Sequence, residues 1–200
     1  MRIIAGDKAR THLLSPQGQS TRPITDRVKE TLFNILQYRL ADARVADLFC
    51  GTGSLGLEAL SRGATSALLV DKDAEVLSRL RQNIDKCGFG PQSTVLKTNL
   101  FRDPPSAELL SHWNRLRPDL IFIDPPYLAS QDGSCQSPLG QLLAAIGEQA
   151  GDGDLLVARH EKRTELLDAY GPFRLYDRRQ YGRMALSFLE SKRGQTPPNL

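Results

Sequence analysis

Cysteine and histidine are scarce in this chain of 200 residues, and those present are scattered. The three cysteines, Cys50, Cys87 and Cys135, form no Cys-x-x-Cys pair, and the three histidines lie far apart in the sequence. This spacing argues against a disulfide framework and against a zinc centre. We therefore expect no metal site, and reduced thiols of the kind found in cytoplasmic proteins.

Long apolar runs are also missing. No stretch reaches the roughly 20 apolar residues that cross a bilayer, and residues 1–6 lack the apolar core of a signal peptide. We expect a cytoplasmic protein with no membrane partner. The hydrophobic content of 40% suits one sizeable core, and the net charge of +3 is compatible with a polyanionic partner without establishing one.

Strand-like and helix-like segments alternate along the chain. Apolar patterns and breakers predict helices at 26–38, 54–62, 73–86, 106–115, 137–149 and 162–169. They predict strands at 45–49, 67–70, 94–97, 119–123, 155–158, 173–178 and 184–189. This order is typical of an α/β fold: a Rossmann-like, mostly parallel seven-stranded sheet with an antiparallel C-terminal strand. We expect a single domain over 1–190, with a short arm or hairpin at 1–20, and a flexible tail at 191–200.

The segment Asp124-Pro125-Pro126-Tyr127 follows a buried apolar strand. An Asp at the carboxyl end of such a strand lies where open α/β sheets bind ligands. The prolines remove two N–H donors, so the carbonyls of Asp124 and Pro125 can face a ligand, and Tyr127 adds a flat ring. Acceptors beside a ring suit a base that carries an exocyclic amine. We predict that Asp124, Pro125 and Tyr127 handle such a base; a strand followed by a rigid turn is the plainer interpretation.

A second motif, Gly51-x-Gly53-x-x-Gly56, lies between an expected strand and an expected helix. Asp71 follows twenty residues after Gly51, at the end of the next strand. Taken alone, this pattern is the fingerprint of a dinucleotide site such as that for NAD. Glycines that serve packing, and an Asp71 that only caps the next helix, are the plainer alternatives.

Asp47 distinguishes a dinucleotide cofactor from a cofactor that carries a positive charge. An acid on the incoming strand would repel a pyrophosphate but suits a cofactor with a cationic part. S-adenosylmethionine carries a sulfonium and an ammonium and no phosphate. We therefore predict that Asp47, Gly51, Gly53 and Asp71 bind this cofactor, with Asn99 beside its adenine.

These residues support methyl transfer to an exocyclic amine. The lone pair of such an amine is delocalised into the ring, which makes the nitrogen a poor nucleophile. Acceptors at the Asp124 carboxylate and the Pro125 carbonyl would favour its rehybridisation as it attacks the sulfonium methyl in line. Positioning and electrostatics supply the rate enhancement, and no covalent intermediate is needed.

The chain resembles the bacterial 16S rRNA guanine-N2 methyltransferases (RsmD-like). The segments that carry the resemblance are Arg22-Pro23-Ile24-Thr25-Asp26-Arg27, residues 47–62, the motif at 124–127, and Tyr181-Gly182 with 185–188. The resemblance implies the class I methyltransferase fold, S-adenosylmethionine as cofactor, and transfer to N2 of one guanine in 16S rRNA that is already bound in a small-subunit particle. We further expect a monomer.

Basic residues and departures from the family pattern bear on RNA contact. Arg22 and Arg27 are the predicted RNA-binding residues, within a wider set of possible phosphate contacts: Lys29, Arg178, Arg179 and Arg183. The arm has fewer arginines than the family pattern, and Arg159-His160 stands where an acid is frequent, so no role is assigned there. Three alternatives stay open: an adenine-N6 DNA methyltransferase, an NAD-dependent oxidoreductase and a non-catalytic RNA-binding module.

Overall fold

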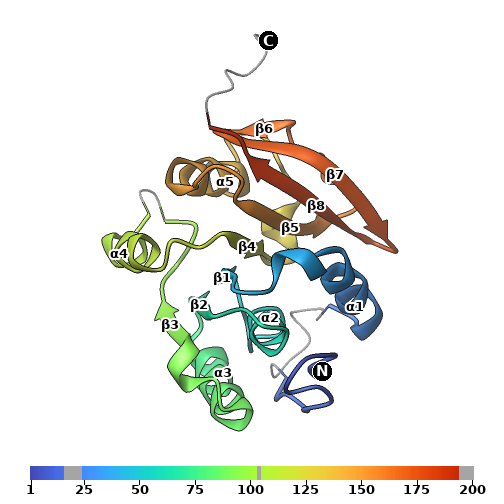
Figure 1. Ribbon diagram of the computed structural model, residues 1–200. Coiled ribbons are helices and arrows are strands. Elements are labelled where there is room, and N and C mark those ends of the chain that lie inside the picture. Colours follow the sequence, from blue (N-terminus) through green and yellow to red (C-terminus); the bar gives the residue numbers. More distant parts are fainter. Residues whose placement is uncertain (16–23, 103–104, 194–200) are drawn as a thin grey trace. The chain divides into compact units, whose positions relative to one another are not determined.

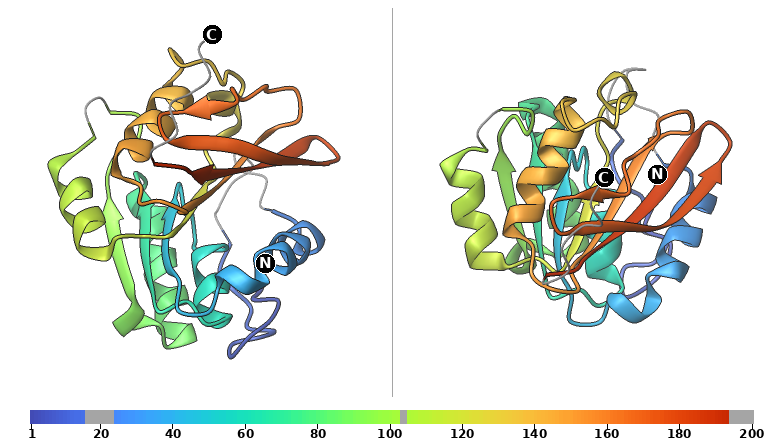
Figure 2. Two further views of the ribbon diagram at one scale, coloured as in Figure 1. Left: turned by 45° about the horizontal axis from the view of Figure 1, so that its top comes forward. Right: turned by 90° about the horizontal axis from the view of Figure 1, so that it is seen from above.

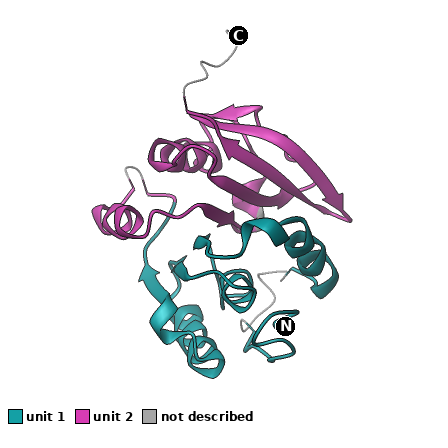
Figure 3. Cartoon of the chain, viewed as in Figure 1, with its two compact units in different colours: residues 1–100 teal, residues 101–200 magenta. Residues whose placement is uncertain are grey.

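A computed structural model describes residues 1–15, 24–102 and 105–193 of the protein. The chain divides into two compact units, residues 1–100 and 101–200, which Figure 3 distinguishes by colour. Arg22 and the tail from 194 onward lie outside the described residues.

Unit 1 is built on three parallel strands in the order β3-β2-β1. Its strands are β1 (Arg44–Leu48), β2 (Ser66–Asp71) and β3 (Ser93–Lys97). Its helices are α1 (Asp26–Ile35), α2 (Gly56–Ser61) and α3 (Ala74–Cys87), with 3-10 turns η1 (Gln37–Arg39) and η2 (Gly90–Gln92). Because α2 and α3 each join one strand to the next, the three strands run in the same direction (Figure 1).

Local signals set the ends of these helices. The hydroxyl of Thr25 accepts a hydrogen bond from the amide of Val28 and so caps α1. Asp73 caps α3 by accepting from the amides of Glu75 and Val76. The helix ends at Gly88, which adopts a φ of +71° that glycine tolerates best.

Unit 2 combines parallel and antiparallel pairs in the order β4-β5-β8-β7-β6. Its helices and 3-10 turn are α4 (Ala107–Leu116), α5 (Pro138–Gln149) and η3 (Tyr127–Ser130). Its strands are β4 (Leu120–Ile123), β5 (Leu155–Glu161), β6 (Ala169–Tyr170), β7 (Phe173–Tyr181) and β8 (Met184–Ser191). β4 and β5 are parallel, whereas β8, β7 and β6 are added antiparallel, and Figure 2 shows β7 and β8 as a long hairpin.

The predicted fold class is confirmed: the chain is α/β, with parallel strands first and antiparallel strands at the C-terminal end. The described residues contain eight strands rather than the predicted seven, because β6 forms a short additional pair with β7. The predicted helix at 162–169 is wrong. There the Thr164 hydroxyl donates to the carbonyl of Ser130, and Gly133 bridges to Leu166, so contacts with another loop replace helical ones.

Residues 1–13 of the predicted arm form a small hairpin, and residues 16–20 of that range lie outside the described residues. Arg2 bridges His12, and the amides of Ile3 and Arg10 donate to the carbonyls of Thr11 and Ile3, respectively. Gly6 at its tip has a φ of +83°, and a Cβ there would lie 1.7 Å from the carbonyl oxygen of Ser61. Only glycine therefore allows the arm to approach α2 this closely.

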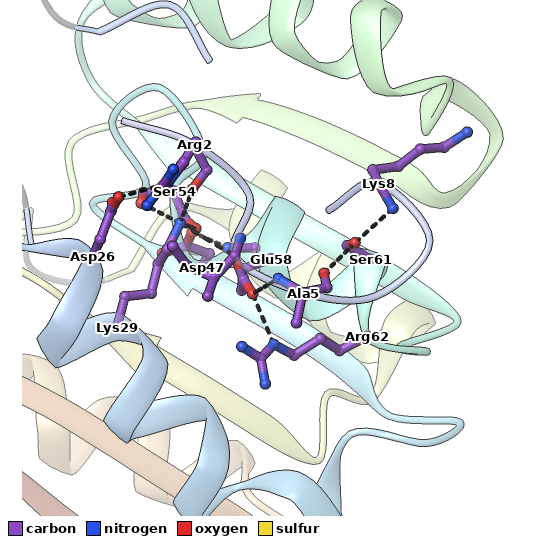
Figure 4. A network of polar contacts seen from close by, with 12 residues as sticks. Arg2, Ala5, Lys8, Asp26, Lys29, Asp47, Ser54, Glu58, Ser61 and Arg62 are labelled. Atoms are coloured by element: carbon purple, nitrogen blue, oxygen red, sulfur yellow. Dashed lines mark hydrogen bonds and ion pairs between the residues drawn. The ribbon is translucent and has the colours of Figure 1, made fainter. Parts of the chain in front are cut away.

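The carboxylate of Glu58 joins the arm to the rest of unit 1 (Figure 4). It is fully buried, and it accepts hydrogen bonds from the amides of Ile4 at 2.7 Å and Ala5 at 3.1 Å. It also forms ion pairs with Lys29 at 3.2 Å and Arg62 at 2.7 Å. One carboxylate thus joins the arm to α1 and α2.

Lys29 is a correction to the predicted phosphate-facing surface. Its side chain is buried and donates to the carbonyl of Arg2 at 2.6 Å as well as to Glu58. Burial lowers the pKa of Lys29, and the neighbouring Glu58 carboxylate opposes that change. Lys29 is therefore part of the interior of unit 1 and cannot contact a phosphate.

Replacing Glu58 by Gln should destabilise the protein by about 3–5 kcal/mol, because Lys29 and Arg62 would lose the buried carboxylate that pairs with both. Urea unfolding measures the change. The control is Arg2→Ala, which removes the exposed ion pair with Asp26 and should cost about 0–1 kcal/mol. An equal loss in both variants would contradict the central role of Glu58.

Candidate functional site

Asp47 lies in β1, and its carboxylate anchors the helix that follows. Its side chain is almost fully buried, and Oδ2 accepts a hydrogen bond from the amide of Gly56, the first residue of α2, at 2.8 Å. A carboxylate at a helix N-terminus is favourably placed with respect to the helix dipole. This contact gives Asp47 a structural role, and its binding of the cofactor's amino group stays a prediction.

The turn between β1 and α2 runs through several residues with positive φ. Phe49, Gly51 and Gly53 have φ values of +62°, +56° and +90°. The amide of Gly51 donates to Oδ2 of Asp71 at 3.0 Å, and Oδ1 of Asp71 accepts from the amide of Asp73 at 3.1 Å. Since Asp73 is the residue that caps α3, Asp71 instead ties the Gly-rich turn to the end of β2.

The glycines of the motif divide into two kinds. A Cβ on Gly53 would lie 2.5 Å from Cδ1 of Leu80, and one on Gly56 would lie 2.3 Å from Cδ2 of Leu69. Close packing therefore accounts for both. A Cβ on Gly51 would meet no atom within 4 Å, so the space beside Gly51 is open. Gly51 is the position where a ligand could approach the backbone.

The predicted cofactor residues gather at one edge of unit 1. β1, β2 and β3 are parallel, so their carboxyl ends lie together, with Asp47 near the end of β1 and Asp71 at the end of β2. Asn99 is exposed and follows β3 by two residues, and the amide of its neighbour Thr98 donates to the Asp71 carbonyl at 3.0 Å. This is the edge at which open α/β sheets bind ligands.

Cys50 lies beside this turn but is not a candidate nucleophile. Burial, followed by the nearby carboxylates of Asp47 and Asp71, raises the pKa of Cys50 well above its ordinary value. The thiol therefore stays protonated at neutral pH, and a protonated thiol is unreactive.

Asp124, Pro125 and Tyr127 follow β4 in unit 2. Pro125 is buried and Pro126 is exposed. The carbonyl of Pro126 accepts a hydrogen bond from the amide of Ala129 at 2.9 Å, which closes the 3-10 turn η3 that begins at Tyr127. The turn after Asp124 is thus fixed by its own backbone, and the roles of these three residues toward a base stay predictions.

Arg159 is a site residue that the sequence reasoning missed. Its Nε donates to Oδ1 of Asp124 at 2.6 Å, and both side chains are mostly buried. Burial raises the pKa of the Asp124 carboxyl, and the Arg159 guanidinium opposes that rise. The pair depends on strand register: Ile123 lies opposite Ala158, so Asp124, which follows β4, lies beside Arg159 of β5.

His160, the residue after Arg159, belongs to the interior. Its Nδ1 lies 2.8 Å from the carbonyl oxygen of Glu161 and its Nε2 lies 2.8 Å from the Ser187 hydroxyl. Because a carbonyl can only accept, the proton resides on Nδ1. Burial lowers the pKa of His160, which keeps the ring neutral.

The predicted RNA-binding residues have different surroundings. Arg27 is exposed on α1. Arg178 donates to the carbonyls of Lys162 at 2.6 Å and Thr164 at 3.1 Å, and Arg179 pairs with Asp177 at 2.8 Å. Arg178 and Arg179 are therefore engaged in local contacts within unit 2, and the contact of the predicted basic residues with RNA stays a prediction.

Two further observations concern the described part of the chain. Within it, no group of three or more His, Cys, Asp or Glu side chains is arranged to hold a metal ion. None of its helices is long and apolar enough to cross a membrane.

Sequence comparison shows the family. The family model described as Conserved hypothetical protein 95 matches residues 1–190. A Bacillus subtilis relative named "Putative rRNA methyltransferase YlbH" is 32% identical over 196 residues, which cover 97% of this chain and 100% of that protein. Ribosomal RNA small subunit methyltransferase D of Escherichia coli is 37% identical over 127 residues, 64% of this chain and 60% of that enzyme.

Comparison with solved structures also finds methyltransferases. The protein yhhF of Escherichia coli superposes with a TM-score of 0.77 at 28% identity, over 96% of this chain and 98% of that chain. An RNA methyltransferase from Salinibacter ruber, solved with S-adenosyl-L-homocysteine, gives a TM-score of 0.61 over 88% of this chain and 98% of that chain. Its identity of 13% means that this second likeness bears on the fold alone.

The fold and the relatives together define a class I methyltransferase, the S-adenosylmethionine-dependent class that the sequence predicted. The chain belongs to the family described as Conserved hypothetical protein 95. The NAD interpretation of the Gly-rich motif is accordingly rejected.

Replacing Arg159 by Leu should raise the pKa of Asp124 further, because the cation that opposes the effect of burial is removed. As the pH is lowered, the Asp124 carboxylate would then be protonated at a higher pH than in the wild-type protein. A reaction that needs the carboxylate would be lost at that higher pH. Carbon-13 NMR titration of labelled Asp measures the pKa. The matched control Arg159→Lys keeps the charge and should shift the titration less; identical curves in all three proteins would contradict the assignment.

Replacing Gly51 or Gly53 by Ala should separate ligand binding from packing. Both replacements strain a left-handed backbone by about 1–2 kcal/mol. Gly53→Ala adds the collision with Leu80, so its melting temperature should fall further. Gly51→Ala should mainly weaken S-adenosylhomocysteine binding, roughly tenfold or more. Calorimetry and thermal unfolding test both variants, and unchanged affinity in Gly51→Ala would refute a ligand beside Gly51.

Proposed function

We propose that this protein transfers the methyl group of S-adenosylmethionine to the exocyclic N2 amine of a guanine in 16S rRNA. The observation that carries the proposal is Asp124: a carboxylate at the carboxyl end of β4, within Asp-Pro-Pro-Tyr, held by Arg159. An acceptor in a fixed position is what a weakly nucleophilic amine requires.

Unit 1 supplies the residues for the methyl donor: Asp47, Gly51, Gly53, Asp71 and Asn99. The open space beside Gly51 allows the methionine part of the cofactor to lie close to the backbone. Each oxygen of Asp71 accepts one amide hydrogen, from Gly51 and Asp73, respectively. Since a carboxylate oxygen can accept two hydrogen bonds, Asp71 retains capacity for the two ribose hydroxyls.

Unit 2 supplies the residues for the acceptor base: Asp124, Pro125 and Tyr127. Arg159 occupies one side of Oδ1 of Asp124 and fixes the direction of the carboxylate. The carboxylate and the Pro125 carbonyl accept the two amine hydrogens, and Tyr127 stacks on the base, a contact of about 1–3 kcal/mol. Asp124 is suited to take up a proton because burial raises its pKa.

The chemical balance is simple. The N2 lone pair of guanine forms the new N–C bond as the C–S bond of the sulfonium breaks, and S-adenosylhomocysteine leaves. The amine gives up one proton to the Asp124 carboxylate or to solvent. Holding the reacting atoms in line accounts for most of the rate enhancement.

The choice of rRNA rests on the relatives. The protein from Bacillus subtilis aligned over nearly the whole chain is named for rRNA methylation, and the Escherichia coli enzyme for the small-subunit RNA. A base within a folded RNA must be turned out before it can react, so an accessible loop is favoured. We further propose that the substrate is a protein-bound small-subunit particle, that the enzyme acts as a monomer in the cytoplasm, and that 1–190 is one domain.

Replacing Asp124 by Asn should reduce the rate of rRNA methylation by roughly 10²–10³-fold, the reduction typical of one key electrostatic contact. The affinity for S-adenosylhomocysteine should stay the same, because the cofactor residues belong to unit 1. The assay follows transfer of a labelled methyl group to small subunits from a strain that lacks the gene.

The position of the labelled methyl group in the product shows whether a guanine N2 amine or an adenine N6 amine was methylated. Nuclease digestion should recover it as N2-methylguanosine. Label in N6-methyladenine of DNA would instead identify the DNA methyltransferase alternative, and full activity of Asp124→Asn would remove Asp124 from the mechanism.

A further inference from the structure

The end of β5 lies at the same edge of unit 2 as Asp124. β4 and β5 are parallel neighbours, with Ile123 opposite Ala158, so their carboxyl ends share one edge. Asp124 follows β4 there. β5 continues to Glu161, and two cations, Lys162 and Arg163, come next.

The β7–β8 hairpin, which Figure 1 shows beside β5, contains a third cation, and the strand register places it at this edge. β8 is antiparallel to β5 and starts at Met184, which is opposite Glu161. Arg183 therefore lies beside Lys162, and the amide of Lys162 donates to the Arg183 carbonyl at 2.9 Å. Lys162, Arg163 and Arg183, all exposed, are called the edge cluster below.

Arg178 fixes the shape of the edge cluster. From β7 its guanidinium donates to the carbonyls of Lys162 at 2.6 Å and Thr164 at 3.1 Å, which are the residues on either side of Arg163. Thr164 is buried and donates in turn to the Ser130 carbonyl at the end of η3. The backbone of the edge cluster is thus attached to the turn that begins at Tyr127.

The charge at this position is predominantly positive. Two acids flank the edge cluster along the chain, the half-buried Glu161 and the exposed Glu165, and Asp177 of β7 is already paired with Arg179. Three exposed cations on one fixed turn suit a row of negative charges such as successive phosphates. Basic side chains that contact phosphates position a nucleic acid without reading its sequence.

We propose that the edge cluster binds the RNA backbone next to the target guanine and so holds the strand while the base reaches Asp124. This inference rests on the proposed function. A turned-out nucleotide needs contacts to its flanking phosphates, and the edge cluster supplies them on the same edge as the carboxylate.

The test replaces Lys162, Arg163 and Arg183 by Gln together. The KM for small subunits should rise roughly tenfold or more, with kcat at saturation and the affinity for S-adenosylhomocysteine unchanged. Binding to deproteinised 16S rRNA is measured by filter retention at several salt concentrations. The slope of log affinity against log salt should fall by about 0.7 for each phosphate that the variant no longer neutralises.

The matched control removes three cations elsewhere. Arg44 at the start of β1, Arg81 in α3 and Arg115 near the end of α4 are exposed, and their replacement by Gln changes the net charge equally. This control should leave KM and the salt slope close to those of the wild-type protein. An equal effect in both triple variants would show a general charge effect and overturn the proposal.

The outcomes also separate this inference from the proposed function. If the edge-cluster variant keeps the KM and the salt slope of the wild-type protein while Asp124→Asn shows the expected loss of rate, the role of the edge cluster is overturned and the proposed reaction stands. A wild-type protein that methylates no rRNA, yet binds RNA through the edge cluster, would overturn the proposed reaction alone.

Discussion

Unit 1 depends on one buried carboxylate, that of Glu58. A charge in the interior is tolerated only if it is paired and hydrogen-bonded, and Glu58 meets both conditions through Lys29, Arg62 and the amides of Ile4 and Ala5. Because Glu58 lies in α2, the arm is held against the same helix whose first amide binds Asp47. The N-terminal hairpin and the Gly-rich turn are therefore supported by one short helix.

Each unit places a set of polar groups at the carboxyl ends of its parallel strands. In unit 1, Asp71 joins the Gly-rich turn to the end of β2, and the space beside the Cα atom of Gly51 is open. In unit 2, Arg159 holds Asp124, and β5 continues into the edge cluster. Strand polarity explains why both sets of polar residues occur at such edges, since open α/β sheets bind ligands there.

Most of the fold could be predicted from the sequence because its signals are local. The caps Thr25 and Asp73, the apolar strands and the Gly-rich motif each specify nearby structure. The helix predicted at 162–169 failed because contacts of Thr164 and Tyr170 with a distant loop determine that segment. Arg159 and the burial of Lys29 were missed for the same reason: their partners, Asp124 and Glu58, are remote in sequence. Such pairs become visible only when strand register and helix packing are known.

The bond between Asp71 and Gly51 has a consequence for the thermodynamics of ligand binding. A loop that must be ordered by its ligand loses conformational entropy at that moment, and the observed affinity is reduced accordingly. In unit 1 the Gly-rich turn is already held to the end of β2, because the amide of Gly51 donates to the Asp71 carboxylate. Cofactor association should therefore involve little backbone rearrangement, and its heat capacity change should reflect the buried apolar surface rather than coupled folding.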